Sequence, residues 1–379
     1  ESAEVSTSKL GEEKMKRKLL SAAMIAATAA TANAGSVSTD GEDLVISTKG
    51  GLKIATQDKS ASFQLGGRLQ WDYDATESKD NGTDTTDFDV RRARLFAKGH
   101  YGDWAYKAQF NIAESGDGGG DAEDLYIRYT GFGKAANITV GKQKESFGLE
   151  ELTSSKDISL LERSAMTEFY APGRSAGIQL HGKGSNWTYG VGIFEADGDG
   201  GNDFDKTAIT GRVTFAPINT GSTLVHLGAG VTRRDADVSD DEVDTYNVEL
   251  AGAFGPFHAQ AEYFHSEQGQ DETDGYYVQA GWIITGESRP YKDGTFKRVK
   301  PGKDGAVEVV VRYEDGDGKY SDIGLASSQR DGEQISVGVN YYANNNVRLG
   351  LSYMDGEGRG ASGNTFEGDE LRARLQFVF

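Results

Sequence analysis

The sequence predicts an all-β protein, a 16-stranded antiparallel transmembrane β-barrel, on three observations. From Ser62 onward the chain repeats segments of about ten residues in which every second side chain is apolar. Short and long polar connections alternate between these segments. The chain ends on Phe377-Val378-Phe379, which is an aromatic end inside a strand pattern. A closed barrel explains this ending, because pairing of the last strand with the first leaves no exposed sheet edge.

The composition favours many strands and open loops over a helical bundle. The 379 residues include 51 glycines, five prolines, 17 phenylalanines, 17 tyrosines and four tryptophans. The formal charge of −19 argues against nucleic acid as a partner, because nucleic acid is itself polyanionic. Because cysteine is absent, disulfides, thiolate metal sites and cysteine catalysis are excluded. HExxH and GxSxG motifs are also absent, so we expect no enzyme activity, no metal and no cofactor.

The N-terminal residues predict export from the cytoplasm. Residues 15–34 contain three basic residues, a weakly apolar stretch and Ala32-Asn33-Ala34, a combination typical of a secretory signal peptide. A membrane anchor is the alternative, but the stretch is shorter than the roughly 18 residues that a spanning helix requires. Residues 1–14 resemble translated upstream sequence, and we expect them to be a non-native upstream segment. We expect residues 35–61 to form a periplasmic segment and residues 62–379 to form the barrel.

Sixteen segments carry the alternating pattern. In the first, Phe63, Leu65 and Leu69 alternate with polar residues, so the two sets lie on opposite faces of a strand. The segments are 62–74, 87–100, 104–113, 122–130, 136–144, 174–182, 186–195, 207–216, 222–233, 244–254, 257–266, 275–285, 306–314, 332–342, 346–354 and 369–379.

The connections distinguish a membrane barrel from a soluble sandwich, whose strands would also alternate. Short turns such as Gly255-Pro256 alternate with long polar loops such as 75–86 and 145–173. Outer-membrane barrels have short periplasmic turns, longer extracellular loops and an even number of strands. The link at 286–305 is an exception, because it is long but falls on the short-turn side. A secreted sugar-binding β-sandwich is the alternative from a different functional class.

Several short motifs carry a resemblance to a known family. They are Leu152-Thr153-Ser154-Ser155-Lys156, Glu162-Arg163-Ser164, Pro172-Gly173-Arg174, Thr285-Gly286-Glu287-Ser288-Arg289-Pro290-Tyr291 and Val299-Lys300-Pro301. With these motifs the chain resembles the phosphate-selective porins O and P of Gram-negative outer membranes. The resemblance implies a homotrimeric porin for passive diffusion of small anions such as phosphate, surrounded by outer-membrane lipid and lipopolysaccharide. It also implies that the third long loop, 145–173, folds into the lumen.

If the apolar side chains face lipid, the residues of opposite parity line the pore, and several of them are arginines. Because the last strand of a closed barrel neighbours the first, the arginines of the two first and two last segments form a stripe on one wall. Guanidinium groups suit oxyanions, since they donate two hydrogen bonds to phosphate or carboxylate without losing charge. The candidate anion-binding residues are Arg68, Arg92, Arg94, Arg348, Arg372 and Arg374.

The third long loop adds Lys144, Lys156 and Arg163 as candidates for a constriction. Its acids, which include Glu162, could instead face the arginine stripe and widen the selectivity. The alternative for the arginines is that they pair with acids on the inner wall and brace the barrel. The first functional hypothesis is a porin for phosphate or related oxyanions. The second is a general diffusion porin with weak or cation-leaning selectivity set by acidic loops.

Overall fold

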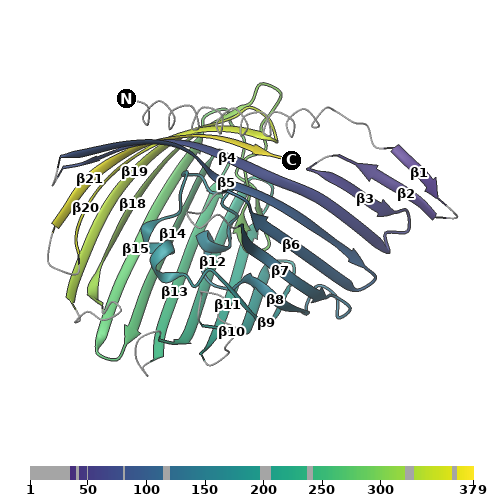
Figure 1. Ribbon diagram of the computed structural model, residues 1–379, viewed down its shortest axis with the longest axis horizontal. Helices are drawn as coiled ribbons and strands as arrows, with labels where there is room; N and C mark the ends of the chain where they lie inside the picture. The colour runs from purple at the N-terminus through teal and green to yellow at the C-terminus, as the bar shows by residue number, and fades with distance from the viewer. Residues whose placement is uncertain are drawn as a thin grey trace, which may run out of the picture.

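The computed structural model describes residues 35–39, 42–48, 50–79, 82–113, 120–196, 206–236, 242–320, 328–360 and 365–379. Within these ranges, sixteen antiparallel strands form a closed barrel (Figure 1). Its last strand, β21 (Thr365–Val378), pairs along its length with its first, β4 (Ala61–Ser78). Closure gives every barrel strand two neighbours, which excludes the β-sandwich and confirms the predicted fold class.

Each predicted segment corresponds to one barrel strand. Between β4 and β21, the barrel strands are β5 (Thr83–Tyr101), β6 (Trp104–Asn111), β7 (Asp121–Tyr129), β8 (Asn137–Lys144), β9 (Arg174–Lys183), β10 (Trp187–Glu195), β11 (Thr207–Asn219), β12 (Thr223–Asp235), β13 (Glu242–Phe254), β14 (Phe257–Gln268), β15 (Asp271–Ile283), β18 (Ala306–Tyr320), β19 (Ser328–Tyr342) and β20 (Val347–Arg359).

The apolar alternation separates an outer face from an inner face. In β10, Val191 and Ile193 are 46% and 60% exposed on the outside, whereas the next residue, Phe194, is buried inside the barrel. Large apolar side chains remain exposed on the outer face of strand after strand. Such an outer face is suited to lipid, because a protein in water rarely exposes contiguous apolar surface of this extent.

Several strands extend beyond the apolar segments that the sequence indicates. β4 and β5 remain paired as far as Ser78 and Thr83, so the predicted loop 75–86 is largely strand. β18 and β19 pair out to Tyr320 and Ser328 in the same way. Strand pairing uses backbone groups and needs no apolar side chains. The apolar pattern therefore marks the lipid-facing part of each strand and not its end.

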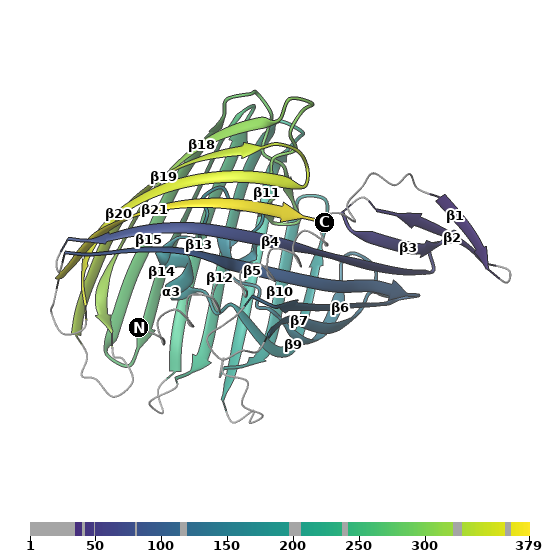
Figure 2. The same ribbon diagram turned by 45° about the horizontal axis from the view of Figure 1, so that its top comes forward.

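Residues 35–56 form three strands that extend the sheet outside the closed barrel. They are β1 (Gly35–Thr39), β2 (Glu42–Ser47) and β3 (Leu52–Thr56). β3 pairs with the start of β4, from Leu52 opposite Leu65 to Ala55 opposite Ser62. The three strands project from the barrel beside the C-terminus (Figures 1 and 2). The predicted upstream residues and signal peptide, 1–34, lie outside the described residues.

The loop between β8 and β9 turns back into the lumen, as predicted for the third long loop. It contains α2 (Leu149–Leu152) and α3 (Ala165–Tyr170), which lie within the ring of strands (Figure 1). Ser164 begins α3 by accepting a hydrogen bond from the Thr167 amide at 2.8 Å. No helix in the described ranges is both long and apolar enough to span a bilayer.

The link between β15 and β18 also folds inward, although it lies on the short-turn side. It forms a small hairpin of β16 (Tyr291–Lys292) and β17 (Thr295–Phe296). Phe296 is fully buried in a cluster with Leu149 of the loop and Leu224 of β12. Loop and link thus pack together against β11 to β13, and they fill that side of the lumen.

Removal of Phe379 should lower the yield of folded barrel severalfold. The Phe379 amide donates to the Gly67 carbonyl at 3.0 Å, the Gly67 amide donates to the Phe379 carbonyl at 2.9 Å, and the ring stacks on Phe377. Deletion removes both closing hydrogen bonds and part of the apolar outer face. Heat-modifiable migration of the outer-membrane fraction on a gel measures the yield. An unchanged folded band would contradict the role of Phe379 in closure.

Candidate functional site

Glu162, at the inner end of the third long loop, docks on the arginine wall. Its carboxylate lies 2.8 Å from Arg92 and 2.5 Å from Arg374, and it also contacts Arg372 at 3.4 Å. Burial favours the neutral acid, but the hydrogen bond and charge of Arg92 and the charge of Arg374 outweigh it. They hold the pKa of Glu162 well below its usual range, so the carboxylate stays ionised.

Three further carboxylates anchor the loop. Glu262 of β14 accepts hydrogen bonds from the Leu149 and Glu150 amides at 2.7 and 2.9 Å. Glu150 in turn accepts from the Ser164 amide at 2.8 Å, which ties α2 to the start of α3. Glu308 of β18 accepts from the Ser159 hydroxyl at 2.7 Å. The loop is therefore held at several points along its length, on strands from opposite sides of the barrel.

The six arginines predicted to bind anions fall into two groups. Arg92, Arg372 and Arg374 pair with Glu162, and the latter two also pair with Asp74 and Asp72 of β4. Arg348 donates instead to loop backbone, reaching the Ile158 carbonyl at 2.7 Å. These four side chains brace the wall and the loop, which is the alternative that the sequence leaves open for them, because acids and loop carbonyls accept their hydrogen bonds.

Arg68 and Arg94 form the second group and line an open cavity. They stand directly opposite each other on β4 and β5. Arg94 pairs with Glu123. Arg68 is 6% exposed, donates to the Ser154 hydroxyl at 3.3 Å and has no carboxylate within ion-pair distance among the described residues. The Nε atoms of both arginines lack a hydrogen-bond partner in the same part of the chain.

Arg91 also points inward, although its sequence parity predicts a lipid-facing side chain. The register between β4 and β5 shifts between Gln70 and Asp72, which is a β-bulge. A bulge adds a residue to one strand and turns its side chain. Arg91 consequently reaches Glu162, with 3.3 Å between its Nε and the carboxylate.

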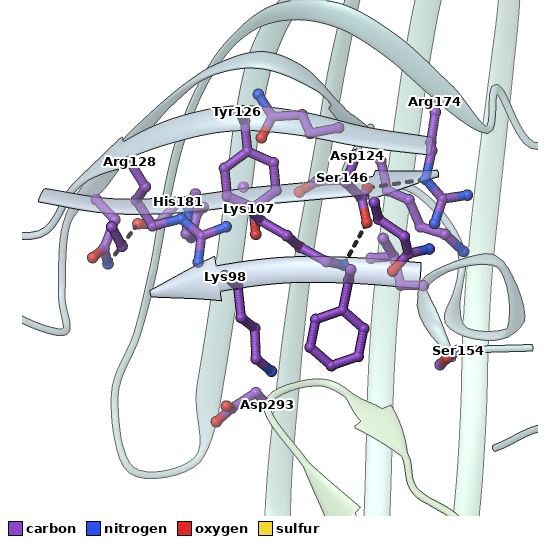
Figure 3. Close-up of a pocket in the computed structure, with 18 of the residues that line it drawn as sticks. Lys98, Lys107, Asp124, Tyr126, Arg128, Ser146, Ser154, Arg174, His181 and Asp293 are labelled. Atoms are coloured by element: carbon purple, nitrogen blue, oxygen red, sulfur yellow. Dashed lines mark hydrogen bonds and ion pairs between the residues drawn. The ribbon is translucent and has the colours of Figure 1, made fainter. Parts of the chain in front are cut away.

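The cavity has a volume of about 1020 Å³ and lies between the inner wall of β4 to β11, the third long loop and the link (Figure 3). Among the described residues, thirteen lysines and arginines line it, against two carboxylates. The cations are Arg68, Arg94, Lys98, Lys107, Arg128, Lys134, Lys144, Lys156, Arg163, Arg174, Lys183, Arg212 and Arg298, and the carboxylates are Asp124 and Asp293.

The three constriction candidates all lie on this cavity. Lys144 and Arg163 share Glu151, at 2.7 and 3.2 Å, and Lys156 pairs with Asp157 at 3.0 Å. Arg163 also donates to the Glu150, Glu151 and Thr153 carbonyls, so it fixes the backbone around α2. Each candidate thus combines a structural contact with a position at the cavity wall.

Several cavity residues are missed by reasoning from the sequence. Arg174 lies an even number of residues from the lipid-facing Ile178 on β9, so the alternation predicts that it faces lipid too. The same holds for its cross-strand partner Lys144, which lies an even number of residues from the lipid-facing Val140 on β8. Both side chains nevertheless face the cavity, because β8 ends at Lys144 and β9 begins at Arg174, where the chain turns into the inward loop. Lys134 and Lys183 lie at or beside short turns, where no alternation indicates a direction. The sequence indicates their role only weakly, through the positive charge of two lysines near the short turns.

The chemistry available in the cavity is anion binding by hydrogen bonds and charge. Asp124 is held by Lys107 and by Arg174, whose Nε lies 3.0 Å away (Figure 3). Arg68, Lys98 and Arg128 have no carboxylate partner in the described part of the chain, so their charge is available to a solute. Among the described residues of the chain, no group of His, Cys, Asp and Glu side chains is placed to hold a metal ion.

Comparison with known proteins agrees with this geometry. The family model for "Phosphate-selective porin O and P" matches residues 63–245 and 232–379. Porin O of Pseudomonas aeruginosa is 30% identical over 95% of this chain and 98% of its own length. The chain belongs to the phosphate-selective porin O and P family. It is a porin for small anions in the Gram-negative outer membrane, and it works as a channel.

Solved structures with the same fold are more distant in sequence. An anion-selective porin from Comamonas acidovorans is 14% identical and has a TM-score of 0.59, covering 84% of this chain and 100% of that one. A trimer form of OmpT from Vibrio cholerae is 13% identical and has a TM-score of 0.56, with the same two coverages. At these identities the likeness establishes the barrel fold.

Acidification should loosen the loop only below the usual titration range of glutamate. The lowered pKa of Glu162 means that its ion pairs stabilise the docked loop fully above the unfolded-state value of 4.5, and that this stability is lost as the pH falls towards the folded-state value. Single-channel current should be steady between about pH 4 and 7 and become noisy only well below about pH 4, because the stabilisation is lost gradually. Glu162→Gln should be noisy at neutral pH. A quiet variant at neutral pH would contradict the docking role.

Proposed function

We propose that the cavity is the solute path of the porin and that Arg68 and Arg94 bind phosphate-like oxyanions there. The observation that carries the proposal is the ratio of cations to carboxylates around the cavity, thirteen to two among the described residues, in a chain of net charge −19. Arg68 adds a buried guanidinium whose Nε has no hydrogen-bond partner and which stands opposite another arginine. Like charges in directly opposed positions are unfavourable. Glu123 compensates Arg94, and the guanidinium of Arg68 has no carboxylate partner of its own among the described residues.

Lys144, Lys156 and Arg163 extend the proposed path towards the third long loop. Beyond the loop, Lys98 and Arg128 continue it towards the short turns, so a solute moves between successive cations. Rows of arginine and lysine select anions in this way, and binding at many sites of moderate strength allows the ion to leave each one. The narrow lumen also screens these charges less than open solution does.

The general diffusion porin is the second candidate, and one observation favours it. Glu162 neutralises much of the arginine wall, as the acids of a less selective constriction would. Under that hypothesis the acidic loops would set the preference of the channel and the remaining cavity cations would contribute little. The two candidates differ in which charges control selectivity, and neutralising each set separately distinguishes them.

We further propose that the porin is a homotrimer whose outer apolar face contacts lipid and lipopolysaccharide. The trimer form recorded for OmpT, which shares the fold, supports this assembly. Residues 15–34 are proposed to direct export as a cleaved signal peptide, with residues 35–61 in the periplasm. Cross-linking of purified porin should give a ladder that ends at three copies.

The double variant Arg68→Gln/Arg94→Gln should raise the phosphate concentration that half-blocks chloride current by about tenfold for each charge removed, since each lost hydrogen bond involves a charged donor. Planar-bilayer recording measures this. Arg233→Gln is the matched control, because Arg233 is exposed and paired with Asp244 at 2.6 Å. Replacement of Asp235, Asp237, Asp240 and Asp241 by Asn should change the block much less. If the aspartate variant changes the phosphate block more than the double arginine variant does, the general diffusion porin is favoured.

A further inference from the structure

The hairpin of the inward link has a tight turn at its tip. Lys292 pairs with Thr295, which leaves Asp293 and Gly294 as the two turn residues. Both have positive φ, 55° and 77°, and an Asp-Gly sequence is favoured in such a two-residue turn. Because Asp293 is one of only two non-glycine residues with positive φ in the described ranges, its position is imposed by the hairpin.

The hairpin tip is fixed against β10 and β11. Arg212 of β11 donates to the Gly294 carbonyl at 2.9 Å. A Cβ atom on Gly294 would lie 2.9 Å from the Thr188 hydroxyl of β10, so the tip is packed closely on the wall. The hairpin begins and ends near β15 and β18 but reaches β10 and β11. It therefore runs along the inner wall, past β14 and β12, at the short-turn end of the cavity.

At this tip the Asp293 carboxylate faces the cavity and pairs with Lys183, the last residue of β9, at 2.7 Å. Lys98 also lines the cavity and has no carboxylate partner among the described residues. The other cavity carboxylate, Asp124, is buried between Lys107 and Arg174, with a side chain 7% exposed. The Asp293 side chain is 44% exposed. Asp293 is thus the cavity carboxylate, among the described residues, that a passing solute meets.

We propose that Asp293 is a specificity-determining residue at the periplasmic exit, where it competes with the solute for Lys183 and promotes release. The inference rests on the proposed solute path. An anion that has crossed the basic cavity would otherwise be held by Lys183 and Lys98, and a channel conducts only if its sites release the ion. Asp293 forms an ion pair with Lys183 in place of the anion, and its negative charge repels the departing anion.

Repulsion by Asp293 also discriminates between anions by charge. Coulomb energy is proportional to the charge of the solute, so a divalent phosphate is repelled about twice as strongly as chloride. The cations deeper in the cavity favour the divalent anion for the same reason. The exit carboxylate therefore weakens the binding of that anion where it must leave, while the deeper cations retain their preference.

The test is phosphate block of chloride current in oriented single porins, with Asp293→Asn. Asn-Gly suits the same turn, so the hairpin should be preserved. The half-blocking concentration of inorganic phosphate should fall about threefold to tenfold, as expected for removing one partly solvated charge. The fall should be larger for phosphate added from the periplasmic side. Lys183→Gln should have the opposite effect and raise the half-blocking concentration.

Asp304→Asn is the matched control, because Asp304 is an exposed acid on the same link and does not line the cavity. It should leave the block unchanged. If Asp293 only holds the hairpin, Asp293→Asn and Lys183→Gln will shift the block in the same direction and both will add current noise, which overturns the inference. An unchanged block in Asp293→Asn also overturns it. Wild-type porin that shows no phosphate block would instead overturn the proposed solute path.

Discussion

The docking of Glu162 on the arginine wall is the interaction on which the arrangement of the lumen depends. One carboxylate contacts arginines on β5 and β21 and, together with the anchors at Glu262 and Glu308, holds the third long loop inside the barrel. The loop acids and carbonyls then occupy the donors of the bracing arginines. The cavity cations on β4 to β9 that have no carboxylate partner among the described residues, such as Lys98 and Arg128, keep their charge available to the cavity. Docking of the loop thus narrows the lumen. It also divides the cations into those that pair with Glu162 and those that line the cavity, which gives the lumen an asymmetry of charge.

The uneven distribution of charge explains how a chain of strongly negative net charge can have a cavity lined mainly by lysine and arginine. Net charge describes the whole surface, much of which is separated from the lumen by more than the Debye length of roughly 8 Å at physiological salt. Within the cavity the relevant charges are close to the solute and partly removed from water, so each one has a larger effect. Selectivity therefore follows from the local excess of lysine and arginine and not from the composition of the chain.

The fold was predictable because one physical constraint, a lipid-facing apolar band, repeats along the chain with a period of two residues. The ends of the strands were less predictable, since pairing continues beyond the apolar band at Ser78 and Thr83. The inward position of Arg68 follows from the same period. The neutralisation of Arg374 does not, because it depends on where Glu162 comes to rest after the loop folds.

The remaining differences arise where the regular alternation is interrupted. A β-bulge turns the Arg91 side chain inward. Arg174 faces inward because it is the first residue of β9, next to the inward loop. The alternation therefore predicts the wrong face for both residues. The inward link is a further example, because its hairpin is short and no periodicity marks it. Its position depends on burial of Phe296 against Leu149, a contact between segments far apart in the sequence. Packing of this kind follows from the closed barrel and has no local signal.

The central claim is that the cavity cations, and not the net charge, set the preference of the channel. The reversal potential of the wild-type porin in a planar bilayer, under a potassium chloride gradient at neutral pH, tests this claim most directly. The account predicts a potential of the sign that shows chloride crossing more readily than potassium, and a shift towards zero when phosphate is added. A potential of the opposite sign would show a cation-preferring pore and would contradict the account.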